Sequence, residues 1–211
     1  MKFYLLDSLL RPSEYAMFSH LGTWETSETC PACDSTRGRL IEPLLVEWNI
    51  GTTRIGDFSW RGYTCIVTDR VRDCLIKHGF PCRFGEVQYV APEKARGFSR
   101  RELKQYGRVP FPYTGPHLSW LIATATVPAD IERSRLKVKE RCDVCGIVRY
   151  SWRRDDLHLV VPAASYSGEK MFTLTQFMTP SIKYVTEEGL AILKGAGFTN
   201  FIVRDAGEII P

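Results

Sequence analysis

The sequence of 211 residues lacks an apolar run of the length that a membrane-spanning helix requires. Its opening, Met1-Lys-Phe-Tyr-Leu-Leu-Asp7, has few apolar residues before a charge and no cleavage site made of small residues, so we expect no signal peptide. The seven cysteines are odd in number, which in such a chain fits reduced thiols and a metal better than a disulfide framework. We therefore expect a cytoplasmic protein without a membrane partner.

The sequence also lacks the signatures of the common enzyme classes. It has no Gly-x-Ser-x-Gly elbow, no phosphate-binding loop and no His-Glu-x-x-His helix. The nearest acid–base cluster is Asp155-Asp156 followed by His158, which we interpret as a turn that enters a strand over residues 157–161. We predict that the protein is not an enzyme.

Composition and charge set wide bounds on the fold and on the partner. Hydrophobic residues make up 44% of the chain and aromatic residues 12%, which is sufficient for a buried core. The formal net charge of +4 is only mildly basic. It permits an acidic or nucleic-acid partner without requiring one.

Two matching pairs of cysteines dominate what the sequence does contain, Cys30-Pro-Ala-Cys33 and Cys142-Asp-Val-Cys145-Gly146. Each pair places two thiols on one tight turn, and together they supply the four sulfurs of a structural zinc site. We predict that Cys30, Cys33, Cys142 and Cys145 bind one structural zinc. Metal-free buried thiols are the first alternative, and a redox Cys-x-x-Cys that opens a helix in a thioredoxin-like unit is the second. Cys65, Cys74 and Cys82 are interpreted as small core residues.

The cysteine pairs belong to a wider internal repeat. Cys30 and Cys142 are separated by 142 − 30 = 112 positions, as are Cys33 and Cys145. Thr68-Asp69 and Thr186-Glu187 match at 186 − 68 = 118, as do Gly79-Phe80 and Gly197-Phe198. We predict an α+β fold of two similar halves, residues 1–97 and 98–211, joined into one compact body by the shared zinc. Each half should hold a thiol turn, a small mainly antiparallel sheet and a helix.

The repeat also predicts the local structure around each helix. We expect helices over residues 68–78 and 186–196, each begun by a threonine cap and ended by a glycine in the left-handed conformation. Strands are expected over residues 2–6, 63–67, 84–90, 183–185 and 201–203. Residues 13–20 are read as weakly helical, and 99–106 as a short basic helix that begins with a capping box.

Basic residues alternate along positions 133–141. As a strand, this segment would place five cations on one face beside the second cysteine pair, namely Arg133, Arg135, Lys137, Lys139 and Arg141. Such a face is usually no more than a solvated surface. Its alternative use is to contact nucleic acid, which gives a zinc-stabilised nucleic-acid-binding protein as the second functional hypothesis. The residues of that contact would be Arg135, Lys137, Lys139, Arg149 and Arg153.

Several of these motifs together resemble one known family. They are the opening Met-Lys-Phe-Tyr, both cysteine pairs and the ending Tyr184-Val-Thr-Glu-Glu-Gly189 with Gly197-Phe-Thr-Asn-Phe201. Across nearly the whole chain the sequence resembles the myxobacterial double-CXXCG paralogous family. Members are regarded as immunity proteins against polymorphic toxin lipoproteins that are exchanged between kin cells. The resemblance thus implies a protein that binds and neutralises a cognate toxin. One position departs from the motif, because Asp34 replaces the first glycine.

An immunity protein must distinguish its own toxin from close relatives, so its contact surface should lie outside the repeated scaffold. The unrepeated segments are residues 93–120 and 13–28. We predict the first as the main toxin-facing surface, with aromatic anchors at Phe98, Tyr106, Phe111 and Tyr113. The alternative is that these aromatics only pack the segment onto the core.

Overall fold

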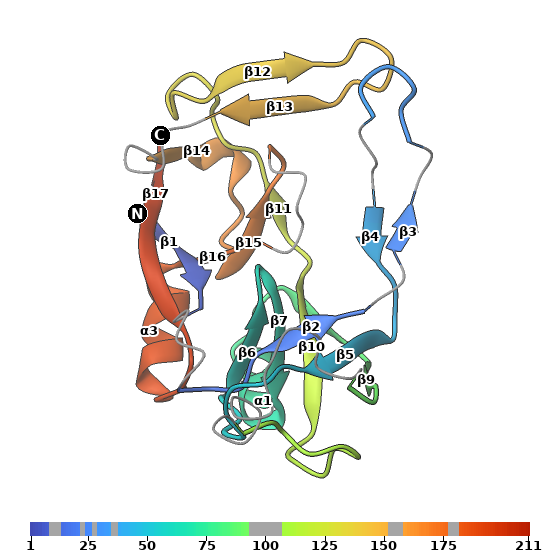
Figure 1. The fold of residues 1–211 in the computed structure, drawn as a ribbon. Coiled ribbons are helices and arrows are strands. Elements are labelled where there is room, and N and C mark those ends of the chain that lie inside the picture. Colours follow the sequence, from blue (N-terminus) through green and yellow to red (C-terminus); the bar gives the residue numbers. More distant parts are fainter. Residues whose placement is uncertain are drawn as a thin grey trace.

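The computed structural model describes residues 1–8, 14–21, 24–26, 29–34, 38–92, 107–151, 158–176 and 182–211. Across these residues it combines many strands with the helices α1 (Asp69–Lys77) and α3 (Glu187–Gly195) and the 3-10 helix η2 (Ala163–Ser165) (Figure 1). The predicted α+β class is therefore confirmed. Within the described ranges, no helix is long and apolar enough to cross a membrane.

The largest sheet has six strands in the order β11-β15-β16-β1-β17-β14. They are β1 (Lys2–Asp7), β11 (Thr126–Val127), β14 (Leu159–Pro162), β15 (Met171–Leu174), β16 (Lys183–Thr186) and β17 (Ile202–Ile210). Neighbouring strands are antiparallel, except that β11 runs parallel to β15 and β14 runs parallel to β17. The N-terminal strand β1 lies inside this sheet, where Phe3 and Leu6 are fully buried.

The second sheet is antiparallel and has the order β6-β7-β10-β8. Its strands are β6 (Phe58–Arg61), β7 (Thr64–Thr68), β8 (Cys82–Gly85) and β10 (Leu118–Ala123). A three-stranded sheet joins β2 (Phe18–His20), β5 (Leu44–Trp48) and β9 (Val87–Tyr89). Two further pairs stand by themselves, β3 (Trp24–Thr26) with β4 (Gly38–Leu40) and β12 (Lys137–Arg141) with β13 (Val148–Ser151).

Each of the two main sheets receives one strand from the other part of the chain. β1 lies between β16 and β17, which flank α3, and is antiparallel to both. In the same way, β10 lies between β7 and β8, which flank α1. Residues 1–97 and 98–211 therefore do not form separate sheets, because each part supplies a central strand to the sheet of the other.

Both predicted helices are present, and each follows directly on a strand. Gly79 and Gly197 end them with φ of +64° and +63°, as the sequence predicts. The Thr186 hydroxyl accepts a hydrogen bond from the Gly189 amide at 3.3 Å and so caps α3. Thr68 does not cap α1 with its side chain, because its hydroxyl donates to Asp57 Oδ1 at 3.2 Å instead. The threonine cap was thus predicted correctly for α3 and wrongly for α1.

The two helices share one hydrophobic core with both sheets. Val71 and Leu75 of α1 and Leu190 and Leu193 of α3 are buried in the same cluster, together with residues of β1, β6, β7, β10, β15 and β16.

The C-terminus of each helix also accepts a hydrogen bond from a cationic side chain in the opposite part of the chain. Arg70 donates to the carbonyl of Ala196, and Lys170 Nζ donates to the carbonyl of His78 at 2.8 Å. A cation at a helix C-terminus is favourable because the last carbonyls lack backbone donors.

The basic stripe predicted over residues 133–141 does not form. Residues 131–135 form turns, where Arg135 has a φ of +53°, and strand β12 begins only at Lys137. The register of β12 on β13 then shifts between Val138 and Glu140, which breaks the alternation of side chains. The five cations therefore do not share one strand face.

The other local predictions have mixed outcomes. The strands over residues 2–6, 63–67, 183–185 and 201–203 correspond to β1, β7, β16 and β17, whereas 84–90 is divided into the end of β8 and β9. Residues 18–20 form β2 rather than part of a helix, and the strand predicted over 157–161 is β14. The predicted basic helix over 99–106 lies outside the described residues.

Lys183 is an unusual member of the core. Its side chain lies on β16, only 2% of the residue's surface is exposed, and its Nζ donates to the carbonyl of Tyr63 at 3.0 Å. Burial lowers the Lys183 pKa from 10.5 to about 8. Burial also raises the pKa of the Cys65 thiol to about 12, so this neighbour stays uncharged near neutral pH. The ammonium group of Lys183 is thus destabilised by its surroundings.

This burial predicts a pH-dependent cost in stability. The unfolded chain binds a proton at Lys183 up to about pH 10.5, whereas the folded protein loses it above about pH 8. The cost is therefore complete below pH 8 and shrinks as the pH rises toward 10.5. We expect the Lys183→Met variant to exceed the wild type in free energy of unfolding at neutral pH by up to about 3 kcal/mol. Urea unfolding at several pH values measures this difference, and a difference that does not change with pH would contradict the assignment.

Candidate metal centre

The first cysteine pair lies on a turn between β3 and β4. Residues 31–33 form the turn, and the Asp34 amide donates to the carbonyl of Cys30 at 2.9 Å. Asp34 has a φ of +53°, the left-handed conformation that the usual glycine of the motif would adopt without strain. Asp is one of the few residues other than glycine that is enriched in this region. The departure from the motif at Asp34 therefore leaves the turn intact.

The second cysteine pair forms the same turn between β12 and β13. The Gly146 amide donates to the carbonyl of Cys142 at 2.9 Å, and Gly146 has a φ of +70°. Asp34 and Gly146 are separated by 146 − 34 = 112 positions, the offset of the cysteines themselves. The Cys142 amide also donates to the carbonyl of Ile147 at 2.9 Å, which closes the turn. Both turns hold their two thiols on one side.

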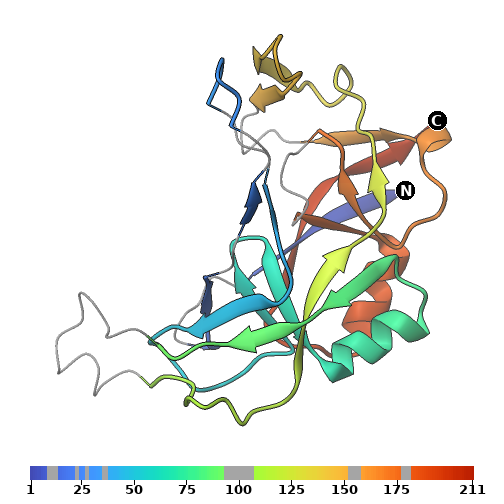
Figure 2. The ribbon, with the colours of Figure 1, turned by 90° about the vertical axis from the view of Figure 1, so that its right-hand side faces the viewer.

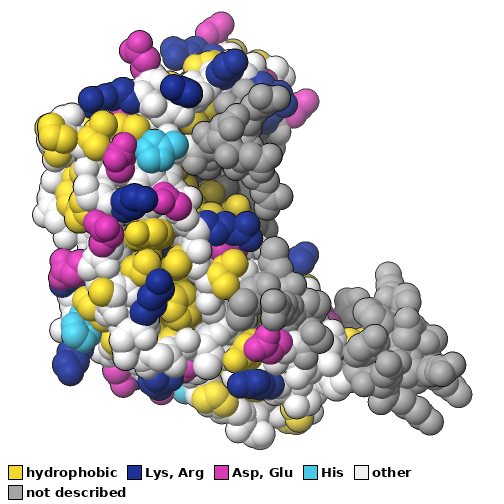
Figure 3. Space-filling view, turned by 90° about the vertical axis from the view of Figure 1, so that its left-hand side faces the viewer, with side chains coloured by type: hydrophobic (Ala, Val, Ile, Leu, Met, Phe, Trp, Pro, Cys, Tyr) yellow, Lys and Arg dark blue, Asp and Glu magenta, His cyan; other side chains and the backbone are white. Residues whose placement is uncertain are grey.

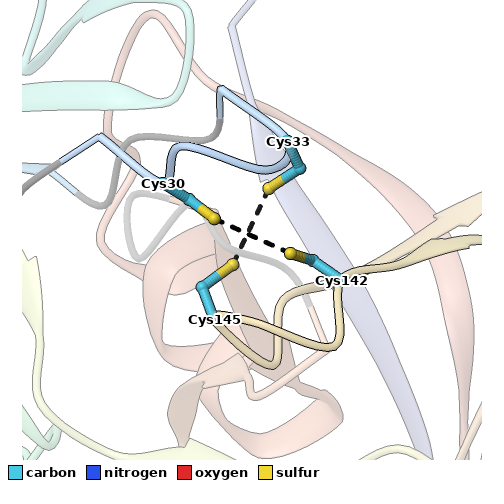
Figure 4. A group of neighbouring side chains, drawn as sticks. All are labelled: Cys30, Cys33, Cys142 and Cys145. Atoms are coloured by element: carbon cyan, nitrogen blue, oxygen red, sulfur yellow. Dashed lines mark hydrogen bonds between the residues drawn. The ribbon is translucent and has the colours of Figure 1, made fainter.

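The four sulfur atoms converge on one point (Figure 4). All four lie within 4.8 Å of one another, and the Sγ–Sγ distance is 3.7 Å for Cys30 with Cys142 and for Cys33 with Cys145. A zinc ion bound tetrahedrally by four thiolates at about 2.3 Å requires sulfurs about 3.8 Å apart. The distances across the two turns match this value, so the thiols are placed to hold a metal ion with little movement.

The chemistry of the four thiols favours a soft or borderline metal. A shell of four sulfurs is typical of zinc or of iron–sulfur sites, whereas hard cations prefer oxygen ligands. A backbone hydrogen bond with Ile147 lowers the Cys145 pKa, but loss of solvent and the three neighbouring sulfurs raise it to about 12. Without a cation, therefore, the Cys145 thiol resists ionisation. A bound metal would supply the positive charge that four thiolates need.

The position of the site agrees with a structural role. Cys30 and Cys142 are buried, and Cys33 and Cys145 are half-buried. Four protein sulfurs would complete a tetrahedral shell and leave no position for water or substrate, which is the arrangement of structural rather than catalytic zinc. Neither cysteine pair opens a helix, since both lie on turns between strands. The thioredoxin-like alternative considered from the sequence is therefore wrong.

The candidate metal centre lies between two projecting parts of the chain. We call them the N-terminal arm, made of β3, the Cys30–Cys33 turn and β4, and the basic hairpin, made of β12, the Cys142–Cys145 turn and β13. In each, the two strands make their main contacts with each other. The two turns meet at the thiols, at the end of the molecule where β12 lies (Figures 1 and 2). The contact between arm and hairpin is thus centred on the four sulfurs.

Basic side chains surround this end of the molecule. Lys137, Lys139 and Arg141 are exposed on β12, and Arg149 of β13 donates to Glu140 at 3.0 Å. Lys and Arg side chains are visible at the same end in the space-filling view (Figure 3). Val144, at the tip of the second turn, is 68% exposed.

The predicted toxin-facing aromatics are only partly described. Phe98 and Tyr106 lie outside the described residues. Phe111 is 49% exposed. Tyr113 is half-buried, its ring lies 4.2 Å from that of Tyr89 between centroids, and its hydroxyl donates to the carbonyl of Pro116 at 2.7 Å. Phe111 is thus available to a partner, whereas Tyr113 mainly packs on its own chain, as the alternative interpretation held.

A groove of about 400 Å³ lies beside these aromatics, and no sequence motif pointed to it. It is lined by Thr53, Ile55, Val109, Pro110, Tyr113, Thr114, Gly115 and Pro116. The prolines and the glycine signal a loop in the sequence, but nothing in the sequence indicates that residues 53 and 55 face it. Figures 1 and 2 show residues 107–117 at the end of the molecule opposite the basic hairpin.

No model of a known protein family matches the chain, and no curated protein matches it either.

The geometry predicts a metal that the fold depends on. Protein purified without chelator should contain one zinc ion per chain. A strong chelator should lower its free energy of unfolding by several kcal/mol, on the order of magnitude expected because the binding free energy of a structural zinc contributes to folding. The Cys145→Ser variant should lose the metal, while Cys74→Ser, a substitution of the half-buried cysteine on α1, should retain it. Elemental analysis and urea unfolding give both readouts, and a metal-free wild-type protein would rule the prediction out.

Proposed function

We propose that the protein is a zinc-stabilised immunity protein that binds and neutralises a cognate toxin in the cytoplasm. The observation that carries the proposal is the convergence of Cys30, Cys33, Cys142 and Cys145, because these cysteines are also the core of the family resemblance. Their convergence supports the resemblance, because both of its cysteine motifs contribute to one site. Inhibition by binding needs a rigid scaffold and a specific surface, and it assigns no catalytic role to the metal.

We further propose that the two halves are copies of one unit. The sulfur pairs, the left-handed residues Asp34 and Gly146, and the ends of α1 and α3 all follow the offsets of 112 and 118. The exchange of β1 and β10 fits this origin, since each unit would contribute one strand to the other. The repeated scaffold would then be shared by relatives, which leaves the unrepeated segments to discriminate between toxins.

The described part of the unrepeated segment 93–120 has features of a contact surface. Phe111 combines a large apolar ring with 49% exposure, and the groove beside Pro110 and Tyr113 provides a concave surface next to it. Exposed aromatic residues beside a groove are typical of the few residues that dominate binding energy in protein interfaces. Within this surface, we assign the anchor to Phe111 and a supporting role to Tyr113.

The nucleic-acid alternative loses one cation of its strand face, because Arg135 lies in a turn before β12, and Arg153 lies outside the described residues. The two hypotheses differ in their response to salt. Binding to nucleic acid weakens steeply as ionic strength rises, whereas a protein complex with an apolar centre persists.

Substitution of the exposed anchor tests the proposal. In cells that express the toxin encoded beside this protein, the wild type should give protection, and Phe111→Ala should weaken toxin binding by about tenfold or more. Its free energy of unfolding should not change, because the ring is half exposed. Tyr63→Ala, which removes another exposed aromatic ring from the β6–β7 turn, serves as the matched control and should protect like the wild type.

Two results would contradict the proposal at different levels. Failure of the wild-type protein to protect against that toxin would reject the function. Full protection and unchanged affinity in Phe111→Ala would instead reject the assigned surface.

A further inference from the structure

The four-thiol centre connects the N-terminal arm with the basic hairpin, since each contributes two of its sulfurs. β3 and β4 make their main contacts with each other, and β12 and β13 do the same. The sulfurs of Cys30 and Cys33, in contrast, lie within 4.8 Å of those of Cys142 and Cys145. The state of these thiols therefore affects how arm and hairpin are joined.

The sulfurs are paired across the two turns. Cys30 faces Cys142 and Cys33 faces Cys145, each at an Sγ–Sγ distance of 3.7 Å. Figure 4 shows the two contacts crossing at the centre of the site. Formation of a disulfide would shorten such a contact to about 2.05 Å. A shift of this size is within reach of side-chain rotation in turns at the surface.

The two pairs differ in their access to solvent. Cys30 and Cys142 are only 6% and 7% exposed, whereas Cys33 and Cys145 are half-buried. A small oxidant from solution would therefore reach Cys33 or Cys145 before it reaches the other pair. Oxidation should begin at the outer pair and then proceed to the inner pair.

We propose that the centre is a redox latch, in which a hydroperoxide replaces the metal link by the disulfides Cys33–Cys145 and Cys30–Cys142. This inference rests on the metal site proposed above and adds its regulation. The latch keeps arm and hairpin joined in two states, metal-bound and oxidised. It opens only when the thiols are both reduced and metal-free.

Each pair of thiols is oxidised to a disulfide in two steps. The sulfur of Cys33 or Cys145 attacks one peroxide oxygen, the O–O bond breaks, and sulfenic acid and water form when the peroxide is hydrogen peroxide. The partner thiol across the site attacks that sulfur, the S–O bond breaks, and a second water leaves as the disulfide forms. Each pair of thiols is oxidised by two electrons, and one hydrogen peroxide is reduced to two waters. When the sulfurs begin as metal-bound thiolates, each pair also takes up two protons from solvent, and the metal would be released without a change in its charge.

Peptide mapping distinguishes the predicted disulfides from those within each motif. Trypsin cuts after Arg37, Arg141 and Arg149, and no Lys or Arg separates the two cysteines of either motif. Each motif therefore stays in a single peptide. Disulfides across the site join the two peptides covalently, whereas disulfides within Cys30–Cys33 and Cys142–Cys145 leave them separate.

The experiment treats the purified, metal-loaded wild-type protein with hydrogen peroxide, blocks remaining thiols, digests with trypsin and measures the peptides by mass spectrometry. We expect the joined peptide to appear as zinc is released to a chelating dye. Separate peptides with internal disulfides, or with sulfinic acids, would overturn the proposal.

Two double variants test the pairing with equal numbers of thiols removed. C30S/C142S retains the outer pair that faces across the site at 3.7 Å, whereas C30S/C145S retains Cys33 and Cys142. The first variant should cross-link several times faster than the second, and equal or reversed rates would reject the assigned pairing. Even if neither variant folds, the wild-type peptide map decides whether the disulfides cross the site or lie within each motif. Toxin protection is measured separately, so a failed latch and a failed immunity function give different results.

Discussion

Four sulfur atoms from two turns that lie 112 positions apart in the chain meet within 4.8 Å, and this contact joins the two projecting parts of the molecule. The N-terminal arm and the basic hairpin each consist of two strands that mainly contact one another. Such a strand pair is marginal in water without further packing. A metal ion shared by the two turns would stabilise both at once, because it would close a long loop and its binding free energy would be gained only in the folded state.

Below the metal centre, the two parts of the chain are joined by their backbones. β1 and β10 each occupy a central position in the sheet of the other part, so separating the parts would break two ladders of hydrogen bonds on each strand. The helix ends repeat this exchange, with Arg70 and Lys170 donating across the molecule. The buried Lys183 opposes these gains, since burial disfavours its charged form. The fold thus tolerates one costly residue because many other contacts cross between the parts.

The structure could be predicted from the sequence where the sequence motif is local or occurs in both parts of the chain. The thiol spacing predicted the cluster of four cysteines, and Gly79 and Gly197 predicted the ends of both helices. The strand exchange could not be predicted, since β1 carries no mark of which sheet it joins. The strand predicted over residues 133–141 from its alternating cations was wrong, because such alternation does not exclude turns or a β-bulge. Thr68 was misassigned because the carboxylate of Asp57, eleven positions earlier, competes for its hydroxyl.

The proposed function places metal and partner surface at opposite ends of the molecule, with the shared core between them (Figure 1). Its central structural claim is that one zinc ion is bound by all four thiols. X-ray absorption at the zinc edge of the purified protein tests this most directly. The account predicts a single shell of four sulfurs at about 2.3 Å with no nitrogen or oxygen ligand. A first shell with fewer sulfurs, or with a lighter ligand, would contradict it.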